Sequence, residues 1–204
     1  MPDQDNEPIE LTERFEEALV YAFRLHQDQV RKQSRTPYVA HLLSVAALVL
    51  EDGGDEDQAI AALLHDAVED QGGMATLEEI RLRFGENVTI IVDALTDAYT
   101  IPKPPWRPRK EAYIAHLHEA SPEVRRVSLA DKLHNARTIL NSVQEEGENT
   151  WDRFRGGKEG TLWYYRSLVT VFRSTGDDLL TAELERVVSE IERLAGPANQ
   201  GNPG

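Results

Sequence analysis

Apolar residues recur every three to four positions along most of this chain, the spacing of helices that bury one face. Residues 87–98 are rich in β-branched side chains, but their apolar positions do not alternate as a strand requires. The pattern predicts an all-α domain over residues 11–195, a bundle of about eight helices, between disordered polar tails at 1–10 and 196–204. The expected helices span residues 12–25, 37–50, 59–70, 76–84, 87–98, 111–119, 122–140, 161–172 and 177–194.

The helix expected over residues 59–70, AIAALLHDAVED, has a buried face and a polar end. On one helix, His65 and Glu69 lie one turn apart, as do Asp66 and Asp70. Three carboxylates and an imidazole this close repel one another and cost desolvation energy unless something neutralises them. A divalent cation would do so. The alternative is a solvated helix end, with His65 as a hydrogen-bonded core residue.

A second polar cluster lies in the helix expected over residues 122–140, within the stretch VSLADKLHNART. Asp131 and Asn135 are four residues apart and share one face, and Thr138 follows three residues later. A carboxylate flanked by apolar neighbours is costly to bury without a partner. Lys132 is adjacent in sequence, but neighbouring helical residues point away from each other. If Asp131 is buried, it therefore needs a partner from another part of the chain.

Two basic segments contain no acidic residue. The first, residues 30–37, holds Arg31, Lys32 and Arg35, and leads directly into the helix that carries His41. The second, TIPKPPWRPRK at residues 100–110, has four prolines, which favour an extended, stiff loop. Both could hold cations toward an anionic ligand at one cleft, Arg107 and Arg109 included. The alternatives are a helix end whose cations complement the dipole, and a solvated linker.

Composition narrows the classes of function. The 204 residues carry 22 Lys and Arg against 36 Asp and Glu, a formal net charge of −14. This charge argues against nucleic acid or an anionic membrane as a partner. The chain has no cysteine, which excludes disulfides and thiolate metal sites. No leader or membrane span is evident, so we expect a cytoplasmic protein; its oligomeric state is left open.

The candidate residues fall in a familiar order. His41, then the pair His65-Asp66, then Asp131 on a later helix, resemble the four metal ligands of the HD superfamily of metal-dependent phosphohydrolases. The motifs RKQSRTPYVAHLL, AALLHDAVED, FGENVTIIVDALT and LADKLHNART are similar to the hydrolase domain of RelA/SpoT-type alarmone enzymes. The resemblance covers most of residues 15–175 and implies the HD helical fold in a small hydrolase without a synthetase domain.

The resemblance also implies a reaction. Two imidazoles and two carboxylates suit Mn²⁺, Fe²⁺ or Zn²⁺, and the alarmone hydrolases imply Mn²⁺. The expected reaction is the hydrolysis of the 3′-pyrophosphate of ppGpp or pppGpp, small-molecule nucleotides. Glu69 and Asp70 would orient or deprotonate the attacking water. The residues implied in substrate binding are Arg31, Lys32, Asn135, Thr138 and Tyr164.

Two alternatives remain. The HD superfamily also acts on other nucleotides with the same metal chemistry, so the fold does not choose the substrate. The proline-rich segment 100–110 and the segment WDRFRGGKEGTLWYYR depart from the best-known alarmone hydrolases. The second alternative is a nucleotide-binding signalling protein that has lost turnover. The complete ligand set and the Glu69-Asp70 pair weigh against it, because a binding module need not keep a costly acid cluster.

Overall fold

The computed structural model describes residues 9–31, 35–97, 99, 102–176 and 179–196. These residues form ten α-helices and one 3₁₀ helix, and their only β-pairing is a bridge between Val30 and Pro37. The predicted all-α fold is confirmed. The helices are α1 (Glu13–His26), α2 (Val39–Glu51), α3 (Glu56–Leu64), α4 (Ala67–Gln71), α5 (Met74–Phe84), α6 (Glu86–Leu95), α7 (Trp106–Glu119), α8 (Pro122–Glu146), the 3₁₀ helix η1 (Gly147–Arg153), α9 (Gly157–Thr175) and α10 (Leu179–Ala195).

The chain divides into two compact units. The first comprises residues 1–103 and 120–131, and the second comprises residues 104–119 and 132–204. Helix α8 contributes its first turns to one unit and the rest to the other. The single domain expected over residues 11–195 stays a prediction.

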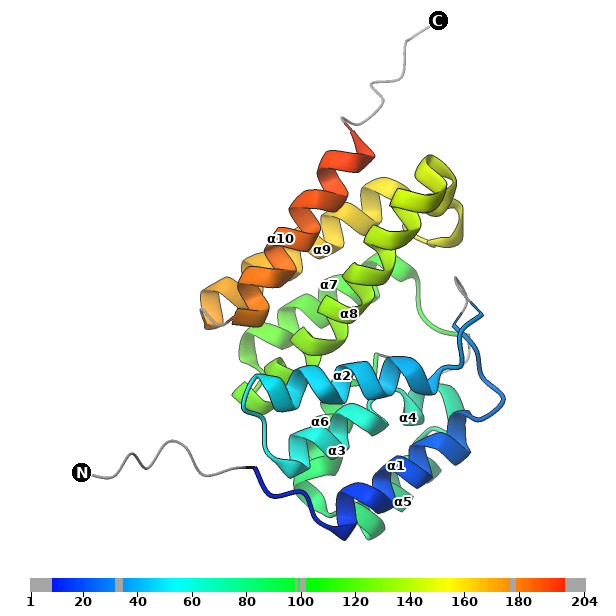
Figure 1. Ribbon diagram of the computed structural model, residues 1–204, viewed down its shortest axis with the longest axis vertical. Coiled ribbons are helices and arrows are strands. Elements are labelled where there is room, and N and C mark those ends of the chain that lie inside the picture. Colours follow the sequence, from blue (N-terminus) through cyan, green and yellow to red (C-terminus); the bar gives the residue numbers. More distant parts are fainter. Residues whose placement is uncertain (1–8, 32–34, 98, 100–101, 177–178, 197–204) are drawn as a thin grey trace, which may run out of the picture. The chain divides into compact units, whose positions relative to one another are not determined.

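Helix α3 forms the centre of the first unit. It packs against α1, α2 and α6 (Figure 1), and every residue from Gln58 to Leu64 is buried. Asp55 begins the helix, since its side chain accepts a hydrogen bond from the Gln58 backbone N–H at 2.9 Å. Such a helix has no polar face to turn to water, so the polar residues that follow it in sequence emerge beside the core.

In the second unit, α9 packs against both α7 and α10. Trp106, at the start of α7, lies against Gly156 and Gly160 at the start of α9. A Cβ atom on Gly156 would come within 2.7 Å of the Trp106 ring, and one on Gly160 within 3.1 Å. The two glycines therefore let the indole approach the α9 backbone.

The structure corrects the helix expected over residues 59–70. Helix α3 ends at Leu64, His65 and Asp66 form a turn, and α4 begins at Ala67. The Asp70 N–H still donates to the Asp66 carbonyl at 3.0 Å, so the helical spacing from Asp66 to Asp70 is kept. Apolar spacing alone does not show this break, because the residues on both sides of it are buried.

We expected the proline-rich segment, residues 100–110, to be extended, but the chain is helical from Trp106 onward. Helix α7 begins at Trp106 and includes Arg107, Arg109 and Lys110. Pro108 lies in its first turn, where a missing N–H costs no helical hydrogen bond.

Other boundaries differ as well. Helix α8 continues to Glu146 and is followed by η1, whereas the expected helix ended at residue 140. The helix expected over residues 76–84 begins two residues earlier, at Met74, as α5. The predicted disordered tails fall largely on residues 1–8 and 197–204, outside the described residues. Within the described part of the chain, no helix has the length and apolar character needed to cross a membrane.

Candidate metal centre

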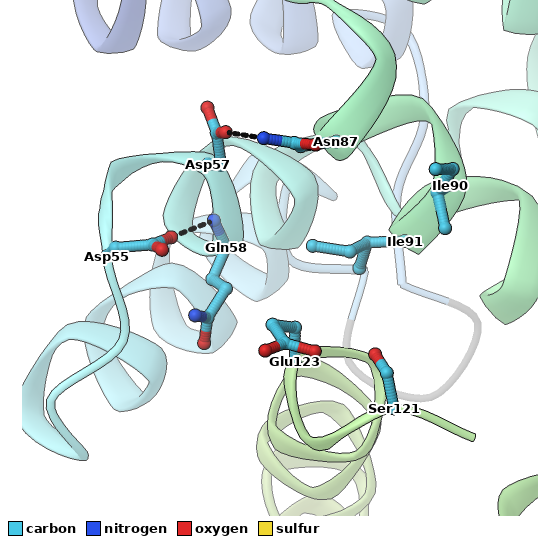
Figure 2. A pocket seen from close by; sticks show the side chains of 8 residues that line it. All are labelled: Asp55, Asp57, Gln58, Asn87, Ile90, Ile91, Ser121 and Glu123. Carbon is cyan, nitrogen blue, oxygen red and sulfur yellow. Dashed lines mark hydrogen bonds between the residues drawn. The ribbon is translucent and has the colours of Figure 1, made fainter. Parts of the chain in front are cut away.

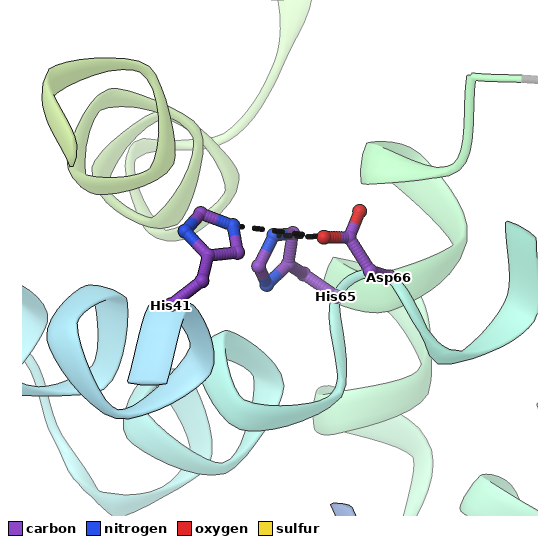
Figure 3. A group of neighbouring side chains, drawn as sticks. All are labelled: His41, His65 and Asp66. Carbon is purple, nitrogen blue, oxygen red and sulfur yellow. Dashed lines mark ion pairs between the residues drawn. The ribbon is translucent and has the colours of Figure 1, made fainter. Parts of the chain in front are cut away.

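Four predicted residues meet in the first unit. Helix α2 supplies His41, the turn between α3 and α4 supplies His65 and Asp66, and α8 supplies Asp131. Both histidines and Asp131 are buried, with 1 %, 5 % and 6 % of their surface exposed, and Asp66 is partly exposed. Figure 3 shows both imidazole rings turned toward the Asp66 carboxylate.

The distances between these atoms fit a shared ion. His65 Nε2 lies 3.0 Å from Asp66 Oδ2 and 3.6 Å from Asp131 Oδ1. His41 Nε2 lies 3.6 Å and 3.3 Å from the same two oxygens. Two atoms bonded to one ion at about 2.1 Å are about 3.0 Å apart at a right angle and about 3.4 Å apart at the tetrahedral angle. The ligand atoms of His41, His65 and Asp66 all lie within 4.8 Å of one another.

The His65 tautomer supports the same interpretation. Its Nδ1 lies 2.7 Å from the Ala62 carbonyl oxygen, which can only accept a hydrogen bond, so Nδ1 carries a proton. In the neutral ring, Nε2 then presents its lone pair to two carboxylates. That arrangement is repulsive unless a positive charge lies between them, either a proton or a metal ion. The donor set therefore fits a metal.

The pKa values of the metal-free protein are consistent with a positive charge at this site. Burial by itself would lower the pKa of the His65 imidazole, but the charges and hydrogen bonds of Asp66 and Asp131 outweigh it and raise that pKa well above its usual value. Burial would raise the pKa of Asp66, but His65 and His41 outweigh it and hold that pKa well below its usual value. The site thus favours an ionised Asp66 beside a positive charge.

Tyr38 holds Asp66 in place. Its hydroxyl donates to Asp66 Oδ2 at 2.5 Å, and its ring lies edge-on to His41 with the centroids 5.6 Å apart. Burial, together with the charge of Asp66, raises the pKa of Tyr38, so the hydroxyl stays a donor. This contact orients a predicted ligand in the way that outer partners orient metal ligands in general.

Glu69 and Asp70, on α4, are held by other residues. Lys103 Nζ pairs with Glu69 Oε1, and the Asp97 backbone N–H donates to Glu69 Oε2 at 3.2 Å. Gln29 Nε2 donates to Asp70 Oδ2 at 2.8 Å. Each carboxylate therefore has a donor from a segment remote in sequence.

The residues expected to bind substrate are in different situations. The Arg31 guanidinium lies 5.6 Å from the centre of the Tyr38 ring, in the first unit. Lys32 falls outside the described residues. Asn135 and Thr138 are half-buried on α8, and Thr138 donates its hydroxyl to the His134 carbonyl at 3.1 Å. Tyr164 is buried in the second unit, where its ring packs against Trp106 and lies 5.0 Å from Lys110 Nζ.

A second polar site in the first unit is a cavity of about 300 Å³ at the starts of α3 and α8 (Figure 2). Its carboxylates already have partners. Asp55 caps α3, and Asp57 pairs with Arg14 at 2.7 Å and accepts from Asn87 at 3.1 Å. Glu123 is in the first turn of α8, and a hydrogen bond with Ser121 lowers its pKa. No histidine lines this cavity, so we assign its acids to the helix starts.

Sequence reasoning missed the roles of Tyr38 and Gln29. Tyr38 was detectable, because it precedes His41 by three residues and so shares its face at the start of α2. Gln29 was not, because its contact with Asp70 depends on how the chain returns after α1. Lys103 had been noted only as part of a basic segment.

Comparisons with known proteins agree with this geometry. A sequence model described as "HD domain" matches residues 18–162. The guanosine-3′,5′-bis(diphosphate) 3′-pyrophosphohydrolase MESH1 of Xenopus tropicalis is 42 % identical over 132 residues, which are 63 % of this chain and 71 % of that protein. The enzyme of the same name from Drosophila melanogaster is 32 % identical over 186 residues, 90 % of this chain and 95 % of that one.

A solved structure shows the same fold. It is described as a metazoan ortholog of SpoT that hydrolyses ppGpp and plays a role in starvation responses. It superposes with a TM-score of 0.73 at 28 % identity and covers 89 % of this chain and 97 % of the other. The match over residues 18–162 and the Drosophila relative, similar over nearly its full length, establish that this chain belongs to the HD domain family.

Proposed function

We propose that this protein hydrolyses the 3′-pyrophosphate of ppGpp or pppGpp with a divalent ion, Mn²⁺, held by His41, His65, Asp66 and Asp131. The observation that carries the proposal is the pair of buried imidazoles that face two shared carboxylates at 3.0–3.6 Å. The MESH1 relatives, named as hydrolases of this nucleotide, support the choice of substrate.

The donor set supports an ion of the Mn²⁺, Fe²⁺ or Zn²⁺ class, since imidazole and carboxylate together suit these metals. When bound, the ion would activate water and offset the charge that develops on the phosphoryl group. The chain's contribution is to fix four ligands, by burying three of them and by holding Asp66 through Tyr38.

The proton acceptor would come from α4. Both Glu69 oxygens already accept hydrogen bonds, from Lys103 and from the Asp97 N–H, which fixes the orientation of the carboxylate. Asp70 accepts from Gln29 through Oδ2, and within the described part of the chain its Oδ1 has no hydrogen bond. We assign these two carboxylates to orienting and deprotonating the attacking water.

We propose that Arg31, Lys32, Asn135, Thr138 and Tyr164 bind the substrate. Arginine's planar fork matches phosphate oxygens. We also propose that Arg107 and Arg109, on α7, face the anionic substrate, which remains an expectation from charge. We expect the protein to act in the cytoplasm.

The experiment is a hydrolysis panel with Mn²⁺, in which ppGpp, GTP, deoxynucleoside triphosphates, cyclic nucleotides and NADPH are compared. We expect pyrophosphate release from ppGpp. Preferred hydrolysis of another member would replace the substrate but keep the chemistry. Bound metal without turnover of any member would support the nucleotide-binding signalling protein instead.

Glu69→Gln separates the metal from the chemistry within the same assay. It removes a proton acceptor and keeps the size of the side chain, so we expect unchanged metal content and kcat about 100- to 10,000-fold lower. The matched control is Glu78→Gln, on the exposed face of α5. Unchanged kcat in Glu69→Gln would remove this residue from the mechanism.

A further inference from the structure

A hydrogen-bond network joins the chain at the end of α1 to helix α4. Gln29 is at its centre. Its Nε2 donates to Asp70 Oδ2 at 2.8 Å, and its Oε1 accepts from Gln71 Nε2 at 2.7 Å. The same Oε1 lies 2.7 Å from Nδ1 of His26, whose ring is buried with 1 % of its surface exposed.

We infer that Gln29 is a positioning residue that aims the Asp70 carboxylate for proton transfer, and that buried His26 fixes the orientation of Gln29. The inference rests on the proposed function, because it assigns Asp70 a part in activating water. The hydrogen bonds of the Gln29 side chain join it to Asp70, Gln71 and His26, so Gln29 acts on the reaction through Asp70.

The chemistry of the groups sets the orientation of the amide. An ionised carboxylate can only accept, so the NH₂ end of Gln29 must face Asp70, and its oxygen must face His26. That oxygen can only accept, so His26 Nδ1 must carry a proton. Gln71 Nε2 is 3.4 Å from the same Nδ1, but two donors cannot bond to each other, and the Gln71 amide instead donates to Gln29. With these neighbours as they stand, turning the Gln29 amide over would lose the hydrogen bonds of its side chain to Asp70, His26 and Gln71.

His26 is itself immobilised. Its ring stacks on Tyr38 with the centroids 5.2 Å apart and the planes inclined by 18°. Its Nε2 is buried and has no hydrogen-bond partner among the described residues, so the Nδ1 contact with Gln29 is the polar contact that orients it. A buried, stacked ring is a rigid reference for a side chain at the surface.

The backbone of Gln29 extends the network to the metal centre. The Gln29 carbonyl accepts from the Tyr38 N–H at 2.9 Å, and the Tyr38 hydroxyl holds Asp66. One residue therefore holds Asp70 directly and reaches the predicted ligand Asp66 through Tyr38. A side-chain substitution at Gln29 cuts only the first connection, because the carbonyl remains.

A purely structural role for Gln29 predicts a different result from a role in positioning Asp70. The Gln29–Asp70 hydrogen bond is exposed to solvent, and exposed pairs of this kind contribute little to the free energy of unfolding. If Gln29 acts only by joining α1 to α4, its loss should lower stability or metal content and leave kcat alone. If it acts through Asp70, its loss should lower kcat and have no further effect once Asp70 is disabled.

The test is a double-mutant cycle in the Mn²⁺-loaded full chain, with Gln29→Leu, Asp70→Asn and the double variant. We expect Gln29→Leu to lower kcat about 10- to 100-fold, as the loss of such outer partners generally does, with KM and metal content unchanged. In the Asp70→Asn background the same substitution should change kcat less than about twofold. Gln29→Glu, which faces Asp70 with a second carboxylate, should lower kcat at least as far as Gln29→Leu.

The matched control is Gln27→Leu, two residues earlier at the exposed end of α1. Equal kcat for Gln29→Leu and Gln27→Leu would overturn the inference, and so would an undiminished effect of Gln29→Leu in the Asp70→Asn background. Loss of metal in Gln29→Leu would also overturn it, because Gln29 would then be needed to form the metal centre. A wild-type protein that hydrolyses no nucleotide would overturn the proposed function itself, and with it this inference.

Discussion

At the scale of single residues, three carboxylates of the candidate site are each oriented by a donor from elsewhere in the fold. Asp66 has Tyr38, Glu69 has Lys103 and the Asp97 N–H, and Asp70 has Gln29. A carboxylate that accepts directed hydrogen bonds is held in one orientation. The donors therefore matter to the chemistry although none is a proposed ligand.

We predict that Tyr38→Phe weakens Mn²⁺ binding about 10- to 100-fold, because Asp66 loses the hydroxyl that fixes it while the ring packing is retained. Calorimetric titration of the metal-free protein measures the affinity. The control is Tyr21→Phe, which removes a buried hydroxyl on α1, away from the metal centre. It should bind Mn²⁺ as the wild type does. Equal affinity in all three proteins would mean that Tyr38 does not position the ligand.

The residues of the centre could be predicted from sequence to different extents. His65, Asp66 and Asp131 were marked by carboxylates next to apolar helix positions, a costly combination without a cation. His41 was typical of an ordinary half-buried histidine until the family pattern was considered. Gln29 and Lys103 could not be assigned, because their partners are 41 and 34 residues away in sequence and only the folded chain brings them together.

At the scale of helices, two departures from the apolar spacing lie at the candidate site and at a pair of glycines. The break at His65-Asp66 turns two side chains toward one point, which a continuous helix would spread along its axis. The start of α9 is set by Gly156 and Gly160, which admit the Trp106 ring of α7. The apolar spacing placed the start of this helix at residue 161 and did not detect the ring that the glycines accommodate.

Gly156→Ala should destabilise the second unit by about 1–3 kcal/mol, the usual cost of overpacking. The backbone there, with φ −80° and ψ −6°, suits alanine, so the cost comes from the Cβ that meets the Trp106 ring at 2.7 Å. Urea unfolding measures it. In a Trp106→Leu background the same change should cost less than about 0.5 kcal/mol. An equal cost in both backgrounds would refute the steric explanation.

The contact between α1 and α5 gives a pH dependence. Burial and the nearby charge of Glu79 raise the pKa of Tyr21 from 10.0 to about 12. Below pH 10 both states keep the proton and the contribution to stability is complete. Between pH 10 and 12 the unfolded chain releases it first, so the free energy of unfolding falls as pH rises. In urea titrations, the free energy of unfolding of Tyr21→Phe should fall less steeply over that pH range than that of the wild type. Equal slopes for the two proteins would show that Tyr21 does not cause the pH dependence.

At the scale of the whole molecule, a chain of net charge −14 must attract a polyanion through local cations. Arg31, whose guanidinium lies 5.6 Å from the centre of the Tyr38 ring, is the cation that we propose for this role in the first unit. Arg31→Ala should raise KM for ppGpp about tenfold or more while kcat is kept, because a charge-assisted contact made with the bound substrate is lost. Arg24→Ala, in the last turn of α1, is the control. An unchanged KM would show that the substrate does not contact Arg31.

The most direct test of the metal centre is to measure bound Mn²⁺ and pyrophosphate release together in the wild type, in Asp66→Ala and in the control Asp152→Ala, an exposed acid on η1. Asp66 Oδ2 faces both imidazoles, so its loss should remove the metal and the activity together. Asp152→Ala should keep both. Full metal content and turnover in Asp66→Ala would contradict the proposed centre.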